Sequence, residues 1–247
     1  MCLHGFLDTW RAWELVLPAL ERRHAVLAPT LPGHAGGPAL DEVDDTVLAD
    51  AVERCMDAAG LETAHVAGNS LGGFLALQLA ARGRARSVVA FAPAGGWARG
   101  DASPGDVYAF QAELQRQARA AAPQAASVLA SRAGRRRATA HLAVNFEHIP
   151  VELLAHQMLG VAACTGAGAM LAHARTAAWP LDVERITCPV RIVWGTEDRL
   201  LPWPSAAERF GRELPHADWV ELDGVGHCPQ LDVPLEAAQL ILGFTAG

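Results

Sequence analysis

The apolar residues of this chain follow two alternating patterns. Short apolar runs, typical of buried strands, occur at residues 25–28, 64–67, 87–92, 190–194 and 219–222. Stretches with apolar residues at helical spacing occur at residues 47–59, 71–82, 205–214 and 235–244. Alternating strands and helices predict an α/β fold, with a mainly parallel sheet covered by helices on both faces. In such sheets, ligands bind at the carboxyl ends of the strands.

The middle of the chain breaks this alternation, because residues 97–179 contain no convincing strand. Segments 107–122, 123–145 and 150–177 are rich in alanine, dotted with arginine and helical in composition. Since they follow the strand at residues 87–92, we expect them to form a helical cap over the carboxyl ends of the strands. The predicted organisation is a core of residues 1–96 and 180–247 with a cap of residues 97–179.

A glycine-rich stretch, Gly68-Asn69-Ser70-Leu71-Gly72-Gly73, lies between a predicted strand and a predicted helix. A glycine inside a helix costs about 1 kcal/mol relative to alanine, so Gly72 and Gly73 weaken the first helical turn. A sharp strand-to-helix turn explains them, because Gly68 and Gly72 lack a Cβ and let strand and helix approach closely. Such a turn presents the Ser70 hydroxyl above the helix N-terminus, where it can act as a nucleophile.

Composition narrows the classes of function. A chain of 247 residues that is 51% hydrophobic fits one globular domain, and its net charge of −7 argues against binding nucleic acid or an anionic membrane. Arg135–Arg137, the one dense basic run, fits a solvated helix face. The most apolar stretch, residues 160–172, is shorter than the roughly 20 residues that span a bilayer, and no secretory signal is present. We therefore expect a soluble protein.

The cysteines indicate the redox environment. They number five and show neither a disulfide framework nor a metal-binding spacing. Reduced thiols in the cytoplasm fit this pattern best. We expect a small-molecule substrate, no cofactor and no metal ion, and neither nucleic acid nor a membrane as a partner. The sequence favours no particular oligomeric state.

Four motifs in chain order resemble those of α/β-hydrolases with a helical cap. The turn around Ser70 resembles the nucleophile elbow and is the most specific match. Near the start of the chain, His4-Gly5-Phe6 resembles the oxyanion loop. Towards its end, Gly195-Thr196-Glu197-Asp198 with Pro202 resembles the acid loop, and Gly224-Val225-Gly226-His227 resembles the histidine loop. The resemblance implies a catalytic triad of Ser70, Asp198 and His227, with an oxyanion hole formed by the backbone N–H groups of Phe6 and Leu71.

The residues themselves support this assignment. Asp198 follows a predicted strand and a glycine, so its carboxylate emerges at the same sheet edge as Ser70. Glu197 and Asp223 are rival acids, but Glu197 would point elsewhere and Asp223 ends a different strand. His227 lies in a glycine-rich loop before the last helix, and histidine can act as a base near neutral pH with little tuning.

Other reactive side chains are interpreted as structural. Cys228 adjoins His227, and because adjacent residues seldom aim at one point, it is not assigned as a nucleophile. His4 has the loop position of a residue that shapes the turn in the family. The remaining histidines are interpreted as packed or surface residues: His24, His34, His65, His141, His148, His156, His173 and His216.

The predicted reaction follows from the elbow and its neighbours. Haloalkane dehalogenases and epoxide hydrolases of this fold carry aspartate at the elbow, so Ser70 disfavours both. Asn69 occurs in C–C bond hydrolases of ring-fission products as well as in esterases, but Cys228 replaces the tryptophan that commonly follows the histidine of the former. This pattern favours hydrolysis of a small carboxylic ester through an acyl-enzyme. The alternatives are C–C bond hydrolysis and a hydrolase-like small-molecule receptor.

Two further expectations concern the pocket and the beginning of the chain. Trp97, Phe146, Met158 and Trp179 are candidate pocket residues by type and position. Members of the family usually have a β-hairpin and a full strand before the His-Gly loop, whereas three residues precede His4 here. We therefore expect the N-terminal strands of the fold to be missing.

Overall fold

The computed structural model describes residues 1–98 and 101–245. Five strands form one sheet whose spatial order equals their order in the sequence, and every pairing is parallel. They are β1 (Cys2–Leu3), β2 (Ala64–Asn69), β3 (Ala85–Phe91), β4 (Val190–Gly195) and β5 (Asp218–Leu222). The predicted α/β fold with a parallel sheet is confirmed, and because every pairing is parallel, the carboxyl ends of all five strands lie at one edge.

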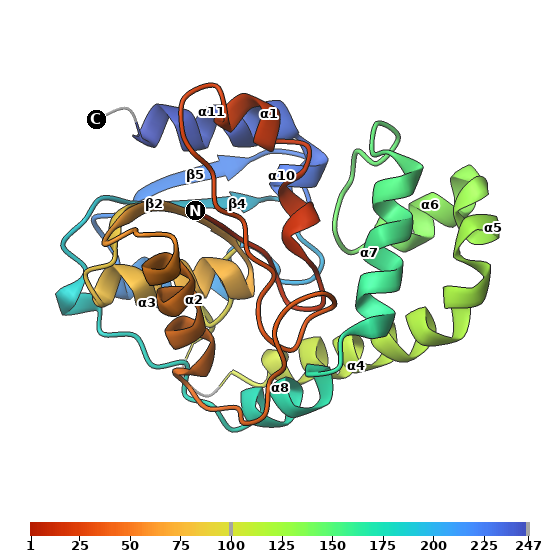
Figure 1. The fold of residues 1–247 in the computed structure, drawn as a ribbon, viewed down its shortest axis with the longest axis horizontal. Helices are drawn as coiled ribbons and strands as arrows, with labels where there is room; N and C mark the ends of the chain where they lie inside the picture. The colour runs from red at the N-terminus through yellow and green to blue at the C-terminus, as the bar shows by residue number, and fades with distance from the viewer. Residues whose placement is uncertain (99–100, 246–247) are drawn as a thin grey trace.

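Both faces of the sheet are apolar, because successive residues of the strands are apolar and their side chains point to opposite sides. Val88 and Ala90 pack with α2 (Val47–Ala58), α3 (Leu71–Ala81) and α9 (Glu208–Glu213), whereas Val89 and Phe91 pack with α1 (Leu17–Leu20) and α11 (Pro234–Thr245). Figure 1 shows α2 and α3 on one side of the sheet and α1 and α11 on the other. The sheet is therefore the middle layer of a three-layer core.

One predicted strand is wrong. Residues 25–28 form no strand, although the N–H of Cys2 donates a hydrogen bond to the carbonyl of Leu27 (2.9 Å). β1 is only two residues long, so it offers too few backbone groups for a ladder, and Pro29, directly after the segment, has no N–H to donate. The apolar run is packed at the edge of the sheet without joining it.

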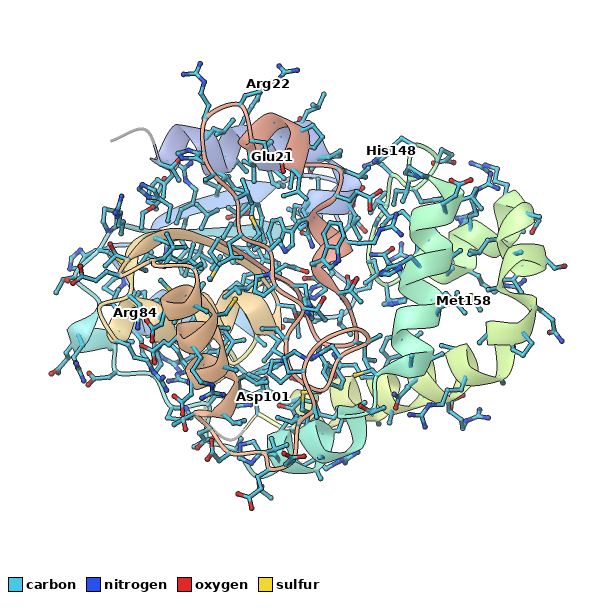
Figure 2. The ribbon with its side chains drawn as sticks, viewed as in Figure 1. Glu21, Arg22, Arg84, Asp101, His148 and Met158 are labelled. Atoms are coloured by element: carbon cyan, nitrogen blue, oxygen red, sulfur yellow. The ribbon has the colours of Figure 1, made fainter. Side chains whose placement is uncertain are left out.

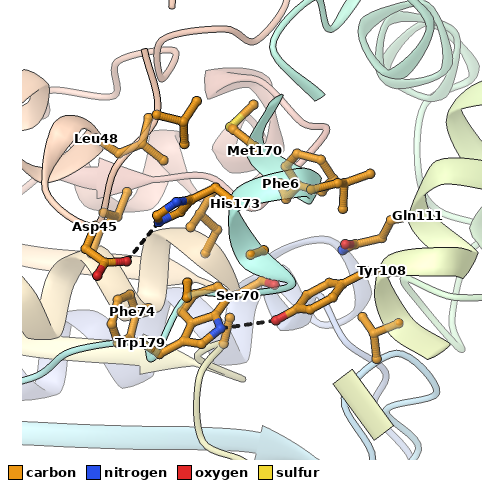
Figure 3. A pocket seen from close by; sticks show the side chains of 18 of the residues that line it. Phe6, Asp45, Leu48, Ser70, Phe74, Tyr108, Gln111, Met170, His173 and Trp179 are labelled. Atoms are coloured by element: carbon orange, nitrogen blue, oxygen red, sulfur yellow. Dashed lines mark hydrogen bonds and ion pairs between the residues drawn. The ribbon is translucent and has the colours of Figure 1, made fainter. Parts of the chain in front are cut away.

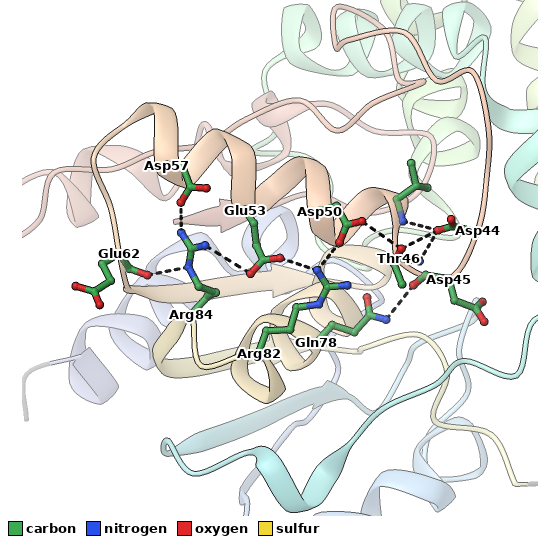
Figure 4. Close-up of polar contacts among 11 residues, drawn as sticks. Asp44, Asp45, Thr46, Asp50, Glu53, Asp57, Glu62, Gln78, Arg82 and Arg84 are labelled. Carbon is green, nitrogen blue, oxygen red and sulfur yellow. Dashed lines mark hydrogen bonds and ion pairs between the residues drawn. The ribbon is translucent and has the colours of Figure 1, made fainter.

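Ion pairs connect α2 to the residues after α3 (Figure 4). Arg82 contacts Asp50 (2.5 Å) and Glu53 (2.6 Å), and Arg84 contacts Asp57 (2.6 Å). These side chains are partly exposed, where an ion pair contributes about 0–1 kcal/mol. The network therefore orients α2 on α3, and the apolar contacts beneath it supply most of the stability.

A group of helices lies beside the sheet, between β3 and β4 in the sequence (Figure 1). It consists of α4 (Ser103–Ala121), α5 (Ala125–Ala130), α6 (Arg132–Thr139), α7 (Val151–Ala163) and α8 (Ala167–Ala174). The predicted helical segment 123–145 is broken into short pieces, because Pro123 lies in a 3-10 turn, η2 (Ala122–Gln124), and the Ser131 hydroxyl starts a new helix by accepting the N–H of Gly134 (3.0 Å).

The remaining elements are short. They are η1 (Trp10–Trp13), η3 (Val183–Arg185), η4 (Ser205–Ala207) and α10 (Pro229–Asp232). The predicted helix 205–214 thus begins as the 3-10 turn η4 and continues as α9. Among the described helices, no single one is long and apolar enough to cross a membrane; α7 and α8 pass that test together but are bent by 72° at their junction.

Candidate active site

Ser70 lies at the turn between β2 and α3 in a strained backbone conformation. Its φ of 55° and ψ of −117° fall in a region that residues with a side chain rarely adopt. The turn is fixed on both sides: the N–H of Ser70 donates to the carbonyl of Phe91 (2.9 Å), and its carbonyl accepts the N–H of Ala94 (3.0 Å). The β3 end therefore keeps the serine in place.

Close backbone packing explains the glycines around Ser70. A Cβ on Gly68 would lie 2.1 Å from the carbonyl oxygen of Gly72, and a Cβ on Gly72 would lie 2.2 Å from the carbonyl oxygen of Leu3. Both obstacles are backbone atoms, which cannot move without shifting a strand or a helix. Strand β2, helix α3 and strand β1 thus meet at distances that only glycine allows.

Asp198 and His227 form a buried pair at the same edge of the sheet. Asp198 follows β4, His227 follows β5, and Nδ1 of His227 lies 2.7 Å from Oδ2 of Asp198. The other carboxylate oxygen accepts the N–H groups of Leu200 (2.9 Å) and Leu201 (2.8 Å). A carboxylate only accepts hydrogen bonds, so Nδ1 carries the proton and Nε2 is left as the basic nitrogen.

The rival acids lie elsewhere. Glu197 is exposed, and Asp223 accepts a hydrogen bond from the hydroxyl of Thr196 (3.3 Å). Of the three candidate carboxylates, Asp198 is the one that contacts His227.

Asn69, next to Ser70, connects the elbow to the histidine loop. Its amide nitrogen donates to the carbonyls of His227 (2.9 Å) and Phe91 (3.1 Å). Its oxygen accepts hydrogen bonds from Gln230 (3.1 Å) and the Cys228 thiol (3.3 Å). Burial raises the pKa of that thiol well above its ordinary value, and nearby carboxylates add to this effect, so it stays protonated. Cys228 is thus a hydrogen-bond donor that holds Asn69.

The loop of Phe6 packs directly against Ser70. A Cβ on Gly5 would lie 3.3 Å from the Cβ of Ser70, and Phe6 and Leu71 both line a cavity together with Ser70. His4 holds this loop: its Nδ1 donates to the carbonyl of Gly5 (2.7 Å) and its Nε2 accepts the N–H of Leu31 (2.9 Å). Burial lowers the pKa of His4, so both interactions are those of a neutral ring.

Two cavities meet at Ser70. The first, here called the apolar cavity, has an empty volume of about 830 Å³ with its open mouth included. Its apolar lining includes Leu71, Phe74, Leu75, Trp97, Met170 and Trp179. Figure 3 shows Ser70 within it, the Trp179 indole donating to the Tyr108 hydroxyl (3.1 Å), and His173 of α8 paired with Asp45 (2.8 Å) at its side.

The second, here called the polar cavity, has an empty volume of about 530 Å³. Its polar lining residues are Asp8, Asn69, Ser70, Gln111, His141, Gln157 and His227. Phe6, Ser70 and Gln111 belong to both cavities, whereas His227 lines only the polar one of the two.

The candidate pocket residues divide into two pairs. Trp97 and Trp179 line the apolar cavity with Ser70. Phe146 and Met158 do not line either cavity at Ser70: Phe146 is buried in the cluster formed by Leu129, Leu153 and their neighbours, and Met158 of α7 packs against that cluster (Figure 2). Both side chains thus belong to the apolar core of the helical group, although Phe146 also lines a further cavity that reaches His227. Their part in the substrate pocket stays a prediction.

Sequence reasoning missed several polar residues of the site. Asp8, Gln111 and Gln157 belong to no motif, and the sequence places His141 among the packed or surface histidines, yet all four line the polar cavity. Burial raises the pKa of Asp8 to about 6, and burial together with the charge of His227 lowers the pKa of His141 to about 4. Among the described residues, no group of three or more His, Cys, Asp or Glu side chains is placed to hold a metal ion.

Comparison with known proteins identifies the family. The model of the alpha/beta hydrolase family matches residues 1–240. The chain belongs to the α/β-hydrolase family. It is 34% identical over 208 residues to the epoxide hydrolase EphH of Mycobacterium tuberculosis, which covers 82% of this chain and 95% of that protein. It is also 30% identical over 272 residues to a pimeloyl-[acyl-carrier protein] methyl ester esterase of Aromatoleum aromaticum, which covers 99% and 97%.

A solved structure shows the same fold. The meta-cleavage product hydrolase CumD from Pseudomonas fluorescens IP01 superposes with a TM-score of 0.72 at 21% identity, covering 98% of this chain and 89% of that one. These relatives are hydrolases, and this chain is a hydrolase of the same family.

Proposed function

We propose that the chain is a serine hydrolase that cleaves a carboxylic ester of a small molecule through an acyl-enzyme. The observation that carries the proposal is the buried Asp198–His227 pair, whose histidine lines the same cavity as Ser70 on its strained turn. A nucleophile, a base and a group that orients the base are the parts that acyl transfer requires.

The proposed reaction runs in two halves. In the first, Nε2 of His227 takes the hydroxyl proton of Ser70 while Oγ bonds to the acyl carbon, and Asp198 stabilises the imidazolium that forms. The C–O bond to the alcohol then breaks as His227 returns the proton to the leaving oxygen. In the second half, His227 takes a proton from water, the resulting hydroxide attacks the acyl carbon, and Ser70 recovers its proton as the acid leaves.

Stabilisation of the oxyanion is assigned to the backbone N–H groups of Phe6 and Leu71. Leu71 is the first residue of α3, where the helix dipole favours negative charge. The His4 hydrogen bonds that hold the Phe6 loop against Ser70 support a fixed position for the other donor. Donors fixed before the reaction lower the barrier because they need no reorganisation during it.

The side chain at the elbow separates ester hydrolysis from epoxide hydrolysis, the activity named for EphH. Attack of Ser70 on an epoxide carbon would form an ether, which water does not cleave under mild conditions. Attack on an acyl carbon forms an ester, which water activated by His227 cleaves. Turnover by Ser70 therefore favours acyl substrates.

C–C bond hydrolysis is the second candidate. The fold matches that of CumD, and a 2-hydroxymuconate semialdehyde hydrolase of Pseudomonas sp. is 35% identical over 102 residues, or 38% of this chain. Because such substrates need the same triad, the triad alone does not separate the two reactions. Relative turnover separates them when one preparation is assayed on p-nitrophenyl esters, thioesters, lactones, dienone ring-fission products and an epoxide. The fastest turnover on a ring-fission product would replace ester hydrolysis as the activity.

Covalent labelling tests the nucleophile directly. We expect a fluorophosphonate probe to modify Ser70 and Ser70→Ala to abolish labelling and ester turnover. Ser127→Ala, on the exposed side of α5, is the matched control and should label like the parent protein. Peptide mapping that places the probe on another serine would contradict the assignment. A kcat of a few per hour on the best ester, well below the common range of about 1–10³ s⁻¹, would support a receptor instead.

A further inference from the structure

Gln157, which lines the polar cavity, has a side-chain oxygen without a hydrogen-bond partner among the described residues. Gln157 of α7 is 6% exposed, and its side-chain oxygen is buried and accepts no hydrogen bond from any residue that the structure describes. Its amide nitrogen lies 3.4 Å from a carboxylate oxygen of Asp8. Buried polar groups are nearly always paired in native proteins, so an unpaired one in a cavity indicates where a ligand binds.

Asp8 adds further accepting capacity beside Gln157. One of its oxygens accepts the N–H of Thr9 (2.8 Å), and the other has, among the residues that the structure describes, only the long contact with Gln157. A carboxylate offers about four acceptor positions and, when ionised, no donor. The two side chains come from different parts of the chain, the loop after β1 and the helix α7, and together they present mainly acceptors to the cavity.

The position of His227 shows which part of an ester faces these acceptors. The histidine must return its proton to the oxygen of the leaving alcohol, so the alcohol lies on the side of His227. Of the two cavities at Ser70, His227 lines the polar one. The acyl chain then occupies the apolar cavity, between Leu71, Phe74 and Trp97.

We propose that the polar cavity selects esters whose alcohol part carries a second hydroxyl group, such as a short diol or glycerol, which donates hydrogen bonds to Gln157 and Asp8. The proposal rests on ester hydrolysis by Ser70 and adds the substrate class. An ammonium group fits the cavity less well, because Phe110, Leu114 and Val161 also line it and a cation would lose most of its hydration there.

Matched esters test this preference without any mutation. We expect kcat/KM for 2-hydroxyethyl hexanoate to exceed that for propyl hexanoate by about 10-fold, the value of one well-formed hydrogen bond to a buried acceptor. 2-Aminoethyl hexanoate should react more slowly than the hydroxyethyl ester. Moving the hydroxyl to the acyl side, in ethyl 6-hydroxyhexanoate compared with ethyl heptanoate, should bring no gain.

Two variants assign the preference to named side chains. Gln157→Met keeps the length of the side chain but removes the acceptor, so the ratio of the two hexanoates should fall to about 2 or less, mainly through the hydroxyethyl ester. Asp8→Asn should lower the ratio as well. Gln117→Met, on the exposed side of α4, is the matched control and should leave both rates unchanged.

The outcomes separate this proposal from the one it rests on. Equal rates on hydroxyethyl and propyl hexanoate, a faster aminoethyl ester, or a hydroxyl preference on the acyl side would each overturn the assignment of the polar cavity while ester hydrolysis stands. A ratio that Gln157→Met and Asp8→Asn leave intact would remove these residues as its cause. Failure to cleave any ester, with activity on another substrate class, would overturn both proposals.

Discussion

At the scale of single residues, the arrangement around His227 leaves little freedom. Asp198 holds the ring through Nδ1, and Asn69 holds the backbone carbonyl of the same residue. Leu200 and Leu201 in turn hold Asp198 through their N–H groups. The loops after β2, β4 and β5 therefore position the ring of His227. Its tautomer depends on one side chain, the carboxylate of Asp198, which accepts the hydrogen bond from Nδ1.

Replacing that acid tests its role. In Asp198→Asn the amide can present N–H groups to the ring, which favours the tautomer with the proton on Nε2, and such a ring cannot accept the proton of Ser70. We expect kcat for the best ester to fall by a factor on the order of 10³–10⁴. KM should change far less, because Asp198 lies behind the ring. Asp223→Asn, in the rival acid, should keep parental kinetics; an equal loss in both variants would contradict the assignment.

What the sequence could predict at this scale depends on local motif structure. Ser70 directly follows β2, and Asp198 and His227 lie in the loops after β4 and β5, so their meeting at one sheet edge follows from the topology. Asp8 and Gln157 have no such signal. They meet because α7 packs beside the loop after β1, and contacts between segments so far apart in sequence depend on tertiary packing.

At the scale of elements, the elbow depends on close packing of three backbones. A Cβ on Gly72 would lie 2.2 Å from the carbonyl oxygen of Leu3 and 2.6 Å from that of His4. Because His4 and Leu3 lead into the loop of Phe6, any shift of β1 away from α3 also moves the proposed oxyanion donor. Stability and catalysis are thus coupled at this glycine.

We therefore expect Gly72→Ala to lower both stability and activity. Overpacking of this kind costs about 1–3 kcal/mol, sometimes more, which corresponds to a Tm lowered by roughly 2–12 °C at this chain length. Thermal unfolding followed by circular dichroism measures it. Gly243→Ala is the matched control: Gly243 is exposed in α11 with open space around its Cβ position, so this change should raise Tm slightly. A neutral Gly72→Ala would contradict the packing argument.

Element boundaries show where sequence patterns are insufficient. The apolar run at residues 25–28 has the pattern of a strand, but its neighbour β1 is too short to pair with it. The segment 123–145 has helical composition, but Pro123 and the capping Ser131 divide it. In both segments the local pattern is that of the predicted element. Whether the element forms, and where it ends, depends on a pairing partner or on a proline and a cap, which periodicity alone does not reveal.

At the scale of the whole molecule, the fold keeps several histidines neutral by burying them. Burial lowers the pKa of His34 to about 4 and, with the charge of His227, that of His141 to about 4, and it also lowers that of His4. The unfolded chain binds protons at these histidines near pH 6.5, whereas the folded chain binds them at His34 and His141 only near pH 4 and resists protonation of His4 as well. Stability must therefore fall as the pH is lowered through this interval.

Asp8 works in the opposite direction. Its pKa in the folded protein is about 6, above the ordinary value of 3.8, so between these values the folded chain binds a proton that the unfolded chain releases. Its contribution to stability is present at low pH and is lost as the pH rises to about 6. One carboxyl group of this kind offsets only part of the effect of the buried histidines.

We expect Tm to fall by several degrees between pH 7 and pH 4.5. The steepness of this fall should depend on the buried histidines and on Asp8. His34→Asn should make the decline shallower, because asparagine does not bind a proton in this interval. The lowering of the His34 pKa from 6.5 to about 4 corresponds to a few kcal/mol of unfolding free energy at most. Asp8→Asn should make the decline steeper by removing the opposing term. His216→Asn, at an exposed position, is the control and should keep the parental slope. Tm measured across this interval decides the matter: identical slopes for His34→Asn and the parent would show that protonation of His34 does not limit stability in acid.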